Sequence, residues 1–311
     1  MRGPFRLITG IALAASAGVT MFPFTGCARK APQASAAYRA EVERWRTQRL
    51  ASLTGDDGWL TVVGLFWLKP GENRFGSDPG NEVVLRGHGV PAFAGSLDLR
   101  SDGLVTAHAR PAGGATLAGQ PVPERALRSD HDRKPDVLAV GSVRFYLIDR
   151  SGRLAVRVKD RESSARADFK RLVYFPINPA FRVEGTFEPY ARAREVTVAS
   201  AQGPAQKMLA PGLVRFTLAG RPLALEPFVS SPDDKEYFFV FRDPTAGHET
   251  YGAGRFLDVP VPAQGSRSVV LDFNYAYNPP CAFTPYATCP LPPRQNDLPI
   301  RIEAGEKFLG H

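Results

Sequence analysis

One segment near the N-terminus carries apolar residues at the spacing of an amphipathic helix. The residues on its apolar face are Tyr38, Val42, Trp45 and Leu53. Most charges fall off this face, and Gly55 follows where helices commonly end. We therefore predict one helix over residues 36–53. Arg49 lies within the apolar face, where it either extends an aliphatic stem over the core or presents its charge to a ligand.

Beyond this segment, short β-rich runs alternate with turn residues. Ser-Asp-Gly, Arg-Ser-Gly and Ala-Gly each separate two runs, which favours hairpins. No long helical pattern intervenes, so antiparallel sheets in a sandwich or barrel are expected rather than a parallel α/β fold. The predicted strands are 98–100 with 105–109, 144–149 with 154–158, 214–218 with 221–225, then 183–187, 196–199, 237–241, 256–259 and 269–273.

Several segments depart from the strand pattern. Residues 111–136 are polar and bear Pro and Gly, which predicts a long loop. Residues 279–299 contain seven prolines, which exclude a helix or a central strand and predict a rigid, extended strap across the surface. The aromatic stretch 59–67 is either core or a sugar-binding platform that exposes Trp59 and Trp67. We place Asn73, Phe75 and Asp78 in a loop that could rim a pocket.

These patterns predict a mainly β fold with one N-terminal amphipathic helix and a proline-rich C-terminal strap. All-β units of this length form single domains, so we expect one domain over residues 38–311. With 43% hydrophobic residues the chain can bury a core. The formal net charge of +8 arises from basic residues spread along the chain rather than from basic runs, so we predict no nucleic-acid partner.

The first residues have the pattern of an export signal. Arg2 and Arg6 precede an uncharged stretch that ends at Gly26 and Cys27. The Gly-Cys step resembles a bacterial lipobox, although Phe24 stands where Leu is usual. We predict a signal peptide over 1–26, a lipidated Cys27 and a tether over 27–37. This anchor would make the membrane a partner and place the protein in the bacterial cell envelope, on the periplasmic face of the outer membrane. Plain secretion or a short signal anchor are the alternatives.

Two cysteines remain after Cys27 is assigned to the anchor. Cys281 and Cys289 are close in sequence, and an oxidising compartment favours a disulfide between them. Free structural thiols or a chemical role are the alternatives. We predict no metal site, because no C-x-x-C pair or His-rich cluster accompanies them.

The chain lacks the common catalytic and nucleotide-binding motifs, so the sequence leaves catalytic residues unknown, and we predict no cofactor. Polar residues instead gather among aromatics near the C-terminus. Buried polar groups need partners, so these residues either form an internal network around Arg255 or line a pocket in which Arg255 holds an anion. The candidate ligand-binding residues are Asp243, Thr245, Tyr251, Arg255, Asp272, Asn274 and Asn278.

These motifs resemble a bacterial family catalogued as domain of unknown function 1684. The resemblance extends over residues 38–309 and brings no established reaction. It rests on residues 58–60, 64–68 and 71–77, on FRDPTAGHETYGAGRFL at 241–257 and DFNYAYNPPC at 272–281, and on 289–293, Asn296 and 304–307.

Three functional hypotheses follow. The first is a lipid-anchored module that binds a small acidic ligand, an envelope polymer or a partner protein near Arg255. The second is a hydrolase-type enzyme in which Asp272 or Glu249 acts as a base and Arg255 stabilises an oxyanion. The third is a structural envelope protein in which the same network only holds the strap in place.

Overall fold

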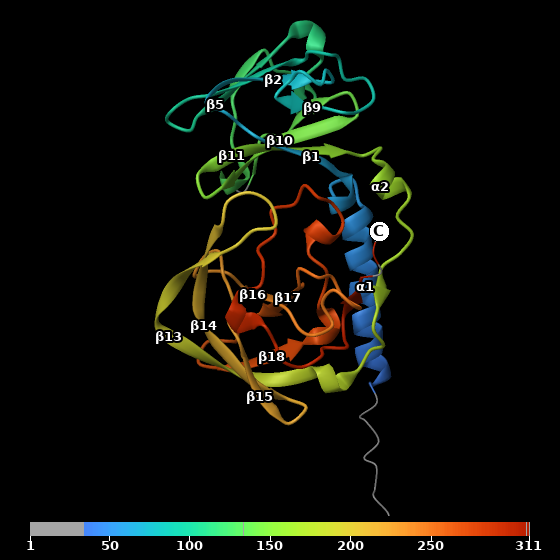
Figure 1. The fold of residues 1–311 in the computed structure, drawn as a ribbon, viewed down its shortest axis with the longest axis vertical. Coiled ribbons are helices and arrows are strands. Elements are labelled where there is room, and N and C mark those ends of the chain that lie inside the picture. Colours follow the sequence, from blue (N-terminus) through green and yellow to red (C-terminus); the bar gives the residue numbers. More distant parts are fainter. Residues whose placement is uncertain (1–33, 133, 309, 311) are drawn as a thin grey trace, which may run out of the picture. The chain divides into compact units, whose positions relative to one another are not determined.

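The computed structural model describes residues 34–132, 134–308 and 310. These residues belong to one compact unit, drawn as the coloured ribbon in Figure 1. The predicted signal peptide, Cys27 and residues 28–33 of the tether lie outside the described residues, so the domain boundaries stay predictions. Within the described residues, no helix is both long enough and apolar enough to cross a membrane.

Helix α1 (Ala36–Thr54) forms where the apolar spacing predicts it. The Ser35 side chain caps its N-terminus by accepting a hydrogen bond from the N–H of Tyr38 at 3.2 Å. Leu53 of the predicted apolar face is fully buried. Gly55 does follow the helix, but its φ of −64° is extended rather than left-handed.

Two sheets share the first hydrophobic core. Their strand orders are β1-β11-β10-β9-β6-β7 and β3-β2-β4-β5-β8, and all pairs are antiparallel except β2 with β3. Alternate residues such as Val156 and Val158 of β11 point into this core. The strands are β1 (Val62–Trp67), β2 (Gly71–Gly76), β3 (Val83–Val84), β4 (Gly95–Leu99), β5 (Val105–Ala109), β6 (Thr116–Leu117), β7 (Gln120–Pro121), β8 (Glu124–Ala126), β9 (Leu138–Val140), β10 (Val143–Arg150) and β11 (Arg153–Asp160).

A four-stranded antiparallel sheet, in the order β15-β14-β13-β18, covers the second core together with the hairpin β16-β17. The two predicted runs 183–187 and 196–199 are parts of one long strand, β13. The mainly β, antiparallel prediction is therefore confirmed, and no sheet among the described residues closes into a barrel. The strands are β12 (Val173–Tyr174), β13 (Arg182–Val198), β14 (Gln206–Leu218), β15 (Arg221–Leu225), β16 (Glu236–Phe241), β17 (Arg255–Pro260), β18 (Ser268–Asp272) and β19 (Glu306–Lys307).

Short helices connect these strands. Helix α2 (Ser164–Ala167) leads from the first pair of sheets into the second half of the chain. The single 3-10 turns are η1 (Trp59–Thr61), η2 (Pro111–Gly113), η3 (Asp130–Asp132), η4 (Pro179–Phe181), η5 (Phe273–Tyr275), η6 (Pro280–Ala282) and η7 (Arg294–Asn296).

Two loop predictions were wrong. Residues 111–136 are not one long loop, because they contribute β6, β7 and β8 to the sheets of the first core. Asn73 and Phe75 do not rim a pocket, because both are fully buried in β2. The Asn73 side-chain amide donates a hydrogen bond to the carbonyl of Lys69 at 2.8 Å. This polar side chain can therefore be buried at little cost in free energy.

The proline-rich strap has no regular strand, as predicted, but it does not lie only on the surface. Apolar residues between its prolines, among them Ala287 and Leu298, are buried. The Thr284 hydroxyl donates to the carbonyl of Val62 at 2.9 Å, which joins the strap to β1. The strap is therefore part of the core rather than a surface belt.

Helix α1 is held to the C-terminal residues by a buried ion pair. Nε of Arg49 donates to Oε1 of Glu306 at 2.9 Å, and Glu306 is fully buried. Arg49 also donates to the carbonyl of Asn278 at 2.9 Å. The partner of this arginine is therefore internal, rather than solvent or a ligand.

This ion pair predicts a pH-dependent loss of stability in Arg49→Gln. Burial raises the pKa of Glu306 above its ordinary value, and Arg49 opposes that shift. A carboxyl group whose pKa is higher in the folded protein than in the unfolded chain contributes its full stabilisation to the fold at pH values below its unfolded pKa. This stabilisation is lost as the pH rises through the folded pKa. Without Arg49 the folded pKa rises further, so urea unfolding should show a loss of about 3 kcal/mol near pH 7 and a much smaller loss near pH 4.

The matched control is Arg44→Gln, because Arg44 lies exposed on the same helix. This variant should change the unfolding free energy by less than about 0.5 kcal/mol at either pH. An equal destabilisation of Arg49→Gln at both pH values would contradict the role given to Glu306.

Candidate functional site

The predicted polar cluster forms a sealed network around Arg255. This side chain is 1% exposed, and its guanidinium lies 3.0 Å from Oδ1 of Asp243. It also donates to the carbonyls of Ile302 and Ala304. Burial lowers the pKa of Arg255, and the nearby carboxylate of Asp243 opposes that shift. The charge of Arg255 is thus neutralised by a carboxylate inside the fold.

Asp243 is the centre of this network. Its carboxylate accepts hydrogen bonds from the hydroxyl of Thr245 at 3.0 Å and from the N–H of Ile302 at 2.8 Å. Gly254, just before Arg255, has φ of +92°, and a Cβ there would lie 2.5 Å from the carbonyl of Phe241. The backbone is therefore shaped to bring Arg255 against Asp243.

Asp272 and Asn274 belong to a second network, which centres on Tyr38 of helix α1. The hydroxyl of Tyr38 donates to Oδ2 of Asp272 at 2.7 Å, and the amide of Asn274 donates to the hydroxyl of Tyr38 at 3.0 Å. The Asn274 amide also donates to the carbonyl of Asn178 at 2.9 Å. These bonds join α1, η4 and η5, so their geometry is that of a structural connection.

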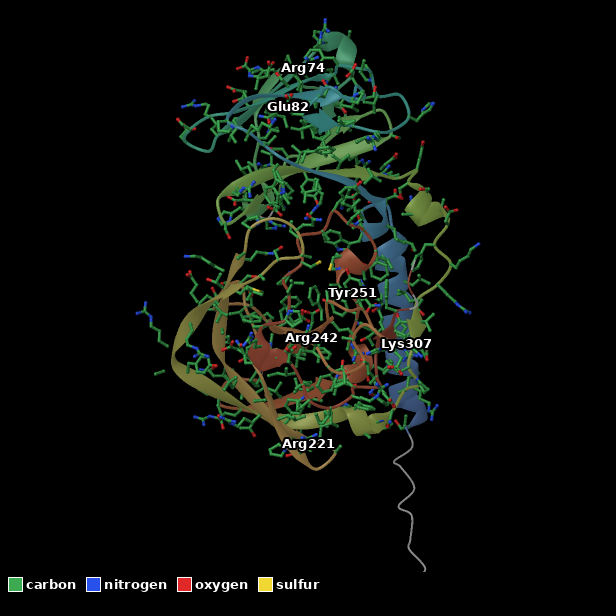
Figure 2. All side chains as sticks on the ribbon, in the orientation of Figure 1. Arg74, Glu82, Arg221, Arg242, Tyr251 and Lys307 are labelled. Atoms are coloured by element: carbon green, nitrogen blue, oxygen red, sulfur yellow. The ribbon has the colours of Figure 1, made fainter. Side chains whose placement is uncertain are left out.

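The last two predicted site residues lie elsewhere. Asn278 is buried beside Glu306, where its N–H donates to Oε2 at 2.8 Å. Tyr251, labelled in Figure 2, donates its hydroxyl proton to the carbonyl of Cys281 at 2.9 Å. The structure thus divides the predicted residues among several networks whose polar atoms are mostly satisfied internally. The ligand-binding assignment stays a prediction, and the geometry favours the structural alternative.

The predicted disulfide is absent from the described residues, where Cys281 and Cys289 are both free thiols. The two nevertheless lie together, because the N–H of Cys281 points to Sγ of Cys289 at 3.3 Å. The hydrogen bond from Cys289 lowers the pKa of the Cys281 thiol, while the same bond and burial raise that of Cys289. Among the described residues, no group of His, Cys, Asp and Glu could hold a metal ion.

A different cavity has the features of a binding site. It has a volume of about 470 Å³ and lies where the hairpin β10–β11 faces residues 280–290. Its charged and polar side chains face apolar ones, which is typical of small-molecule sites. We call it the Arg157 pocket, and it is lined by Trp59, Asp149, Arg150, Ser151, Arg157, Gln206, Lys207, Phe256, Pro280, Thr288, Cys289 and Pro290.

Arg157 is the unusual residue of this pocket. It is 4% exposed, and it makes no ion pair with any residue that the structure describes. Its Nε has no hydrogen-bond acceptor in the same part of the chain. The guanidinium carbon lies 4.9 Å from the centre of the Trp59 ring, which gives the charge an aromatic neighbour but no counter-ion.

The other cations of the pocket are already paired. Arg150 lies 2.9 Å from Oδ2 of Asp130, and Lys207 lies 2.8 Å from Oε1 of Glu195. Arg157 is therefore the lining cation whose charge no described carboxylate neutralises. Asp149 also lines the pocket, but its carboxylate makes no ion pair with a described residue and accepts from the N–H of Gly152 at 2.8 Å.

The hydroxyl of Thr288 is oriented by two arginines. Nε of Arg150 donates to Oγ1 at 3.0 Å, and a terminal nitrogen of Arg157 donates to the same atom at 3.3 Å. An arginine cannot accept a hydrogen bond, so both lone pairs of the oxygen are used. Among the described residues nothing accepts the Thr288 proton, which leaves it beside Arg157 as a donor to a ligand.

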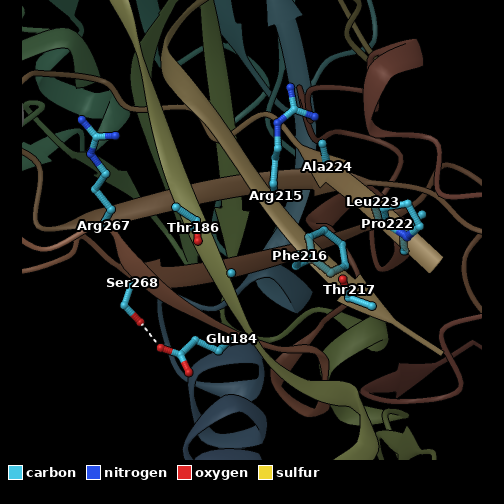
Figure 3. A pocket seen from close by; sticks show the side chains of 11 residues that line it. Glu184, Thr186, Arg215, Phe216, Thr217, Pro222, Leu223, Ala224, Arg267 and Ser268 are labelled. Carbon is cyan, nitrogen blue, oxygen red and sulfur yellow. Dashed lines mark hydrogen bonds between the residues drawn. The ribbon is translucent and has the colours of Figure 1, made fainter. Parts of the chain in front are cut away.

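A larger hollow lies on the outer face of the sheet β15-β14-β13-β18 (Figure 3). Its charged side chains are exposed, and Arg215 pairs with Glu188 at 2.6 Å. The hydroxyl of Ser268 donates to Glu184 at 2.6 Å, the dashed line of Figure 3. This hollow is the solvent side of the sheet, and it lacks a buried group that needs a partner.

Sequence reasoning missed the Arg157 pocket for a definite reason. Residues 154–158 were predicted as a strand, in which Arg157 between two valines should face solvent. The alternation is correct, because Val156 and Val158 do face the first core. The pattern did not show that the proline-rich strap covers the opposite face. Trp59, considered as core or as a sugar platform, is partly buried against the core and also lies under the Arg157 guanidinium.

The fold and pocket define a mainly β protein with a buried, unneutralised arginine beside a hydroxyl donor. The chain belongs to the family described as protein of unknown function (DUF1684), whose model matches residues 167–307. The matched part includes both C-terminal motifs of the resemblance, while those at 58–77 lie before it.

The chain is similar to the solution NMR structure of an uncharacterized protein of Haloarcula marismortui, at 33% identity and a TM-score of 0.41. That similarity covers 47% of this chain and 81% of the other. No curated protein matches the chain.

The Arg255 network predicts a large loss of stability in Arg255→Ala. The substitution would leave the Asp243 carboxylate buried without its counter-ion, which should cost about 3–5 kcal/mol in urea unfolding. The control is Arg242→Ala, because Arg242 (Figure 2) is half-exposed and pairs with Asp297 at 2.8 Å on the surface. This control should lose less than about 1 kcal/mol. An Arg255→Ala protein as stable as the wild type would contradict the structural role.

Proposed function

We propose that this protein is a lipid-anchored protein of the cell envelope that binds a small organic anion in the Arg157 pocket. The observation that carries the proposal is the buried guanidinium of Arg157, which lacks a carboxylate partner among the described residues. A buried charge without a partner is strongly unfavourable, so a site that retains one is suited to receive the opposite charge from a ligand.

The ligand group that fits best is a carboxylate. A carboxylate bears one negative charge, which can pair with Arg157, the one lining cation that makes no ion pair with a described residue. Its two oxygens can accept from the guanidinium of Arg157 and from the hydroxyl of Thr288. A phosphate monoester carries close to two charges at neutral pH and would leave one of them unbalanced.

The rest of the ligand should be apolar. Trp59, Phe256 and the prolines at 280 and 290 line the same pocket as Arg157. Such a lining favours a ring or a branched hydrocarbon over a freely hydrated ion, because burying apolar area is favourable. Small aromatic carboxylates are therefore the ligand class that we propose.

The lipid anchor is the second half of the proposal. Cys27 follows a stretch with the features of an export signal, and the Gly-Cys step is where lipoprotein signals are cut. Acyl chains hold a protein at a membrane with roughly 0.8 kcal/mol for each buried methylene. The anchored protein would then meet its ligand in the periplasm.

We predict that benzoate stabilises the wild-type protein and that Arg157→Met abolishes this effect. At a concentration about 100 times its dissociation constant, benzoate should add about 2.7 kcal/mol, visible as a rise in Tm. Without ligand, Arg157→Met should be as stable as the wild type or more stable, because it removes an uncompensated charge. Acetate and inorganic phosphate should bind more weakly than benzoate.

Two controls make this test specific. Benzamide has the same shape as benzoate without its charge, and it should not stabilise the protein. Arg153→Met changes an exposed arginine on the same strand and should keep benzoate binding. Equal effects of benzamide and benzoate, or benzoate binding retained in Arg157→Met, would refute the site.

We predict that the native protein lacks residues 1–26 and begins at an acylated Cys27. Intact-mass analysis of the membrane fraction should show this mass, and Cys27→Ser should release the protein from the membrane. An unprocessed N-terminus, or a mature chain without acyl mass, would overturn the anchor but not the pocket.

A further inference from the structure

The two thiols adjoin the Arg157 pocket. Cys289 is 5% exposed and lines the pocket directly, and Sγ of this residue lies 3.3 Å from the amide nitrogen of Cys281. The residue before Cys289 is Thr288, whose hydroxyl is the donor that we assign to the ligand. A covalent change at Cys289 would therefore occur one residue from the binding group.

We propose that Cys281 and Cys289 form a reversible dithiol–disulfide couple whose oxidation weakens anion binding in the Arg157 pocket. This inference rests on the proposed function, because it concerns the regulation of that same site. It differs from a purely structural disulfide in two respects. The bond is reversible in the folded protein, and its formation lowers the affinity for the ligand.

The direction follows from the contacts of the reduced state. The amide of Gln206 donates to the carbonyl of Thr288 at 2.6 Å, and the N–H of Ala201 donates to the carbonyl of Cys289 at 2.8 Å. These bonds hold the Thr288 hydroxyl against both arginines. A disulfide needs a specific Cβ–S–S–Cβ geometry, so its formation would turn Sγ of Cys289 from the N–H of Cys281 toward the sulfur of Cys281. Thr288 would then lose its alignment with Arg157.

The chemistry balances with an external low-molecular-weight disulfide as the oxidant. The thiolate of Cys281 attacks one sulfur of that disulfide, which forms a mixed disulfide and releases one thiolate. The thiol of Cys289 then loses its proton and attacks Cys281 Sγ, which releases a second thiol. Cys281 suits the first step, because it is more exposed than Cys289 and its hydrogen bond from Cys289 lowers its pKa.

The test uses the full chain with Cys27→Ser, which leaves Cys281 and Cys289 as the only cysteines. The protein is equilibrated in mixtures of oxidised and reduced glutathione, alkylated and weighed by mass spectrometry. Benzoate affinity is measured by calorimetry in the fully reduced and fully oxidised states. We expect a reversible conversion and a Kd about fivefold higher in the oxidised state, as the loss of one hydrogen bond implies.

Cys281→Ala in the same background is the matched control. It cannot form the disulfide, and its benzoate Kd should be the same in both buffers. Equal affinity of the parent protein in its two states would overturn the coupling and leave the proposed function standing. A disulfide that never forms, or that cannot be reduced in the folded protein, would overturn the redox couple. No benzoate binding in either state would overturn the proposed function and this inference with it.

Discussion

The charge of Arg157 is buried against the ring of Trp59, and no described carboxylate forms an ion pair with it. Arg255 shows how the same fold treats a buried guanidinium that has a structural role, with Asp243 at 3.0 Å and two carbonyls completing its hydrogen bonds. Both side chains are almost inaccessible, so burial does not distinguish them. Charge balance does, because one is neutralised within the chain and the other is not.

The position of the Arg157 side chain is set by the hairpin β10–β11 and by the proline-rich strap. The hairpin β10–β11 directs its valines into the first core, and the alternation of a strand then turns Arg157 to the opposite face. That face is covered by the proline-rich strap, which brings Thr288 and Cys289 to the guanidinium. Proline fixes the backbone of the strap without a sheet, and buried residues such as Ala287 hold it in the core. The proposed site is thus assembled from segments far apart in sequence.

The fold could be predicted from local patterns to a considerable extent. The spacing of Tyr38 and Leu53 located the helix, and the turn sequences located three hairpins at their observed positions. What failed depended on contacts across the chain. The short strands β6 to β8 are too brief to show a period, and the Asn73 amide points inward, where it also reaches the carbonyl of Leu97 on β4 at 3.3 Å. The same limit applies to the site: the composition pointed to Arg255, and no local signal marked Arg157 as buried.

Our central proposal is that a ligand carboxylate neutralises the buried charge of Arg157. A crystal structure with para-bromobenzoate tests it most directly, because the anomalous signal of bromine locates the ligand without ambiguity. We expect bromine among Trp59, Phe256 and the neighbouring prolines, with the carboxylate in hydrogen-bond contact with the guanidinium of Arg157 and the hydroxyl of Thr288. Bromine bound elsewhere, or an Arg157 that turns out to pair with a carboxylate of the protein, would contradict it.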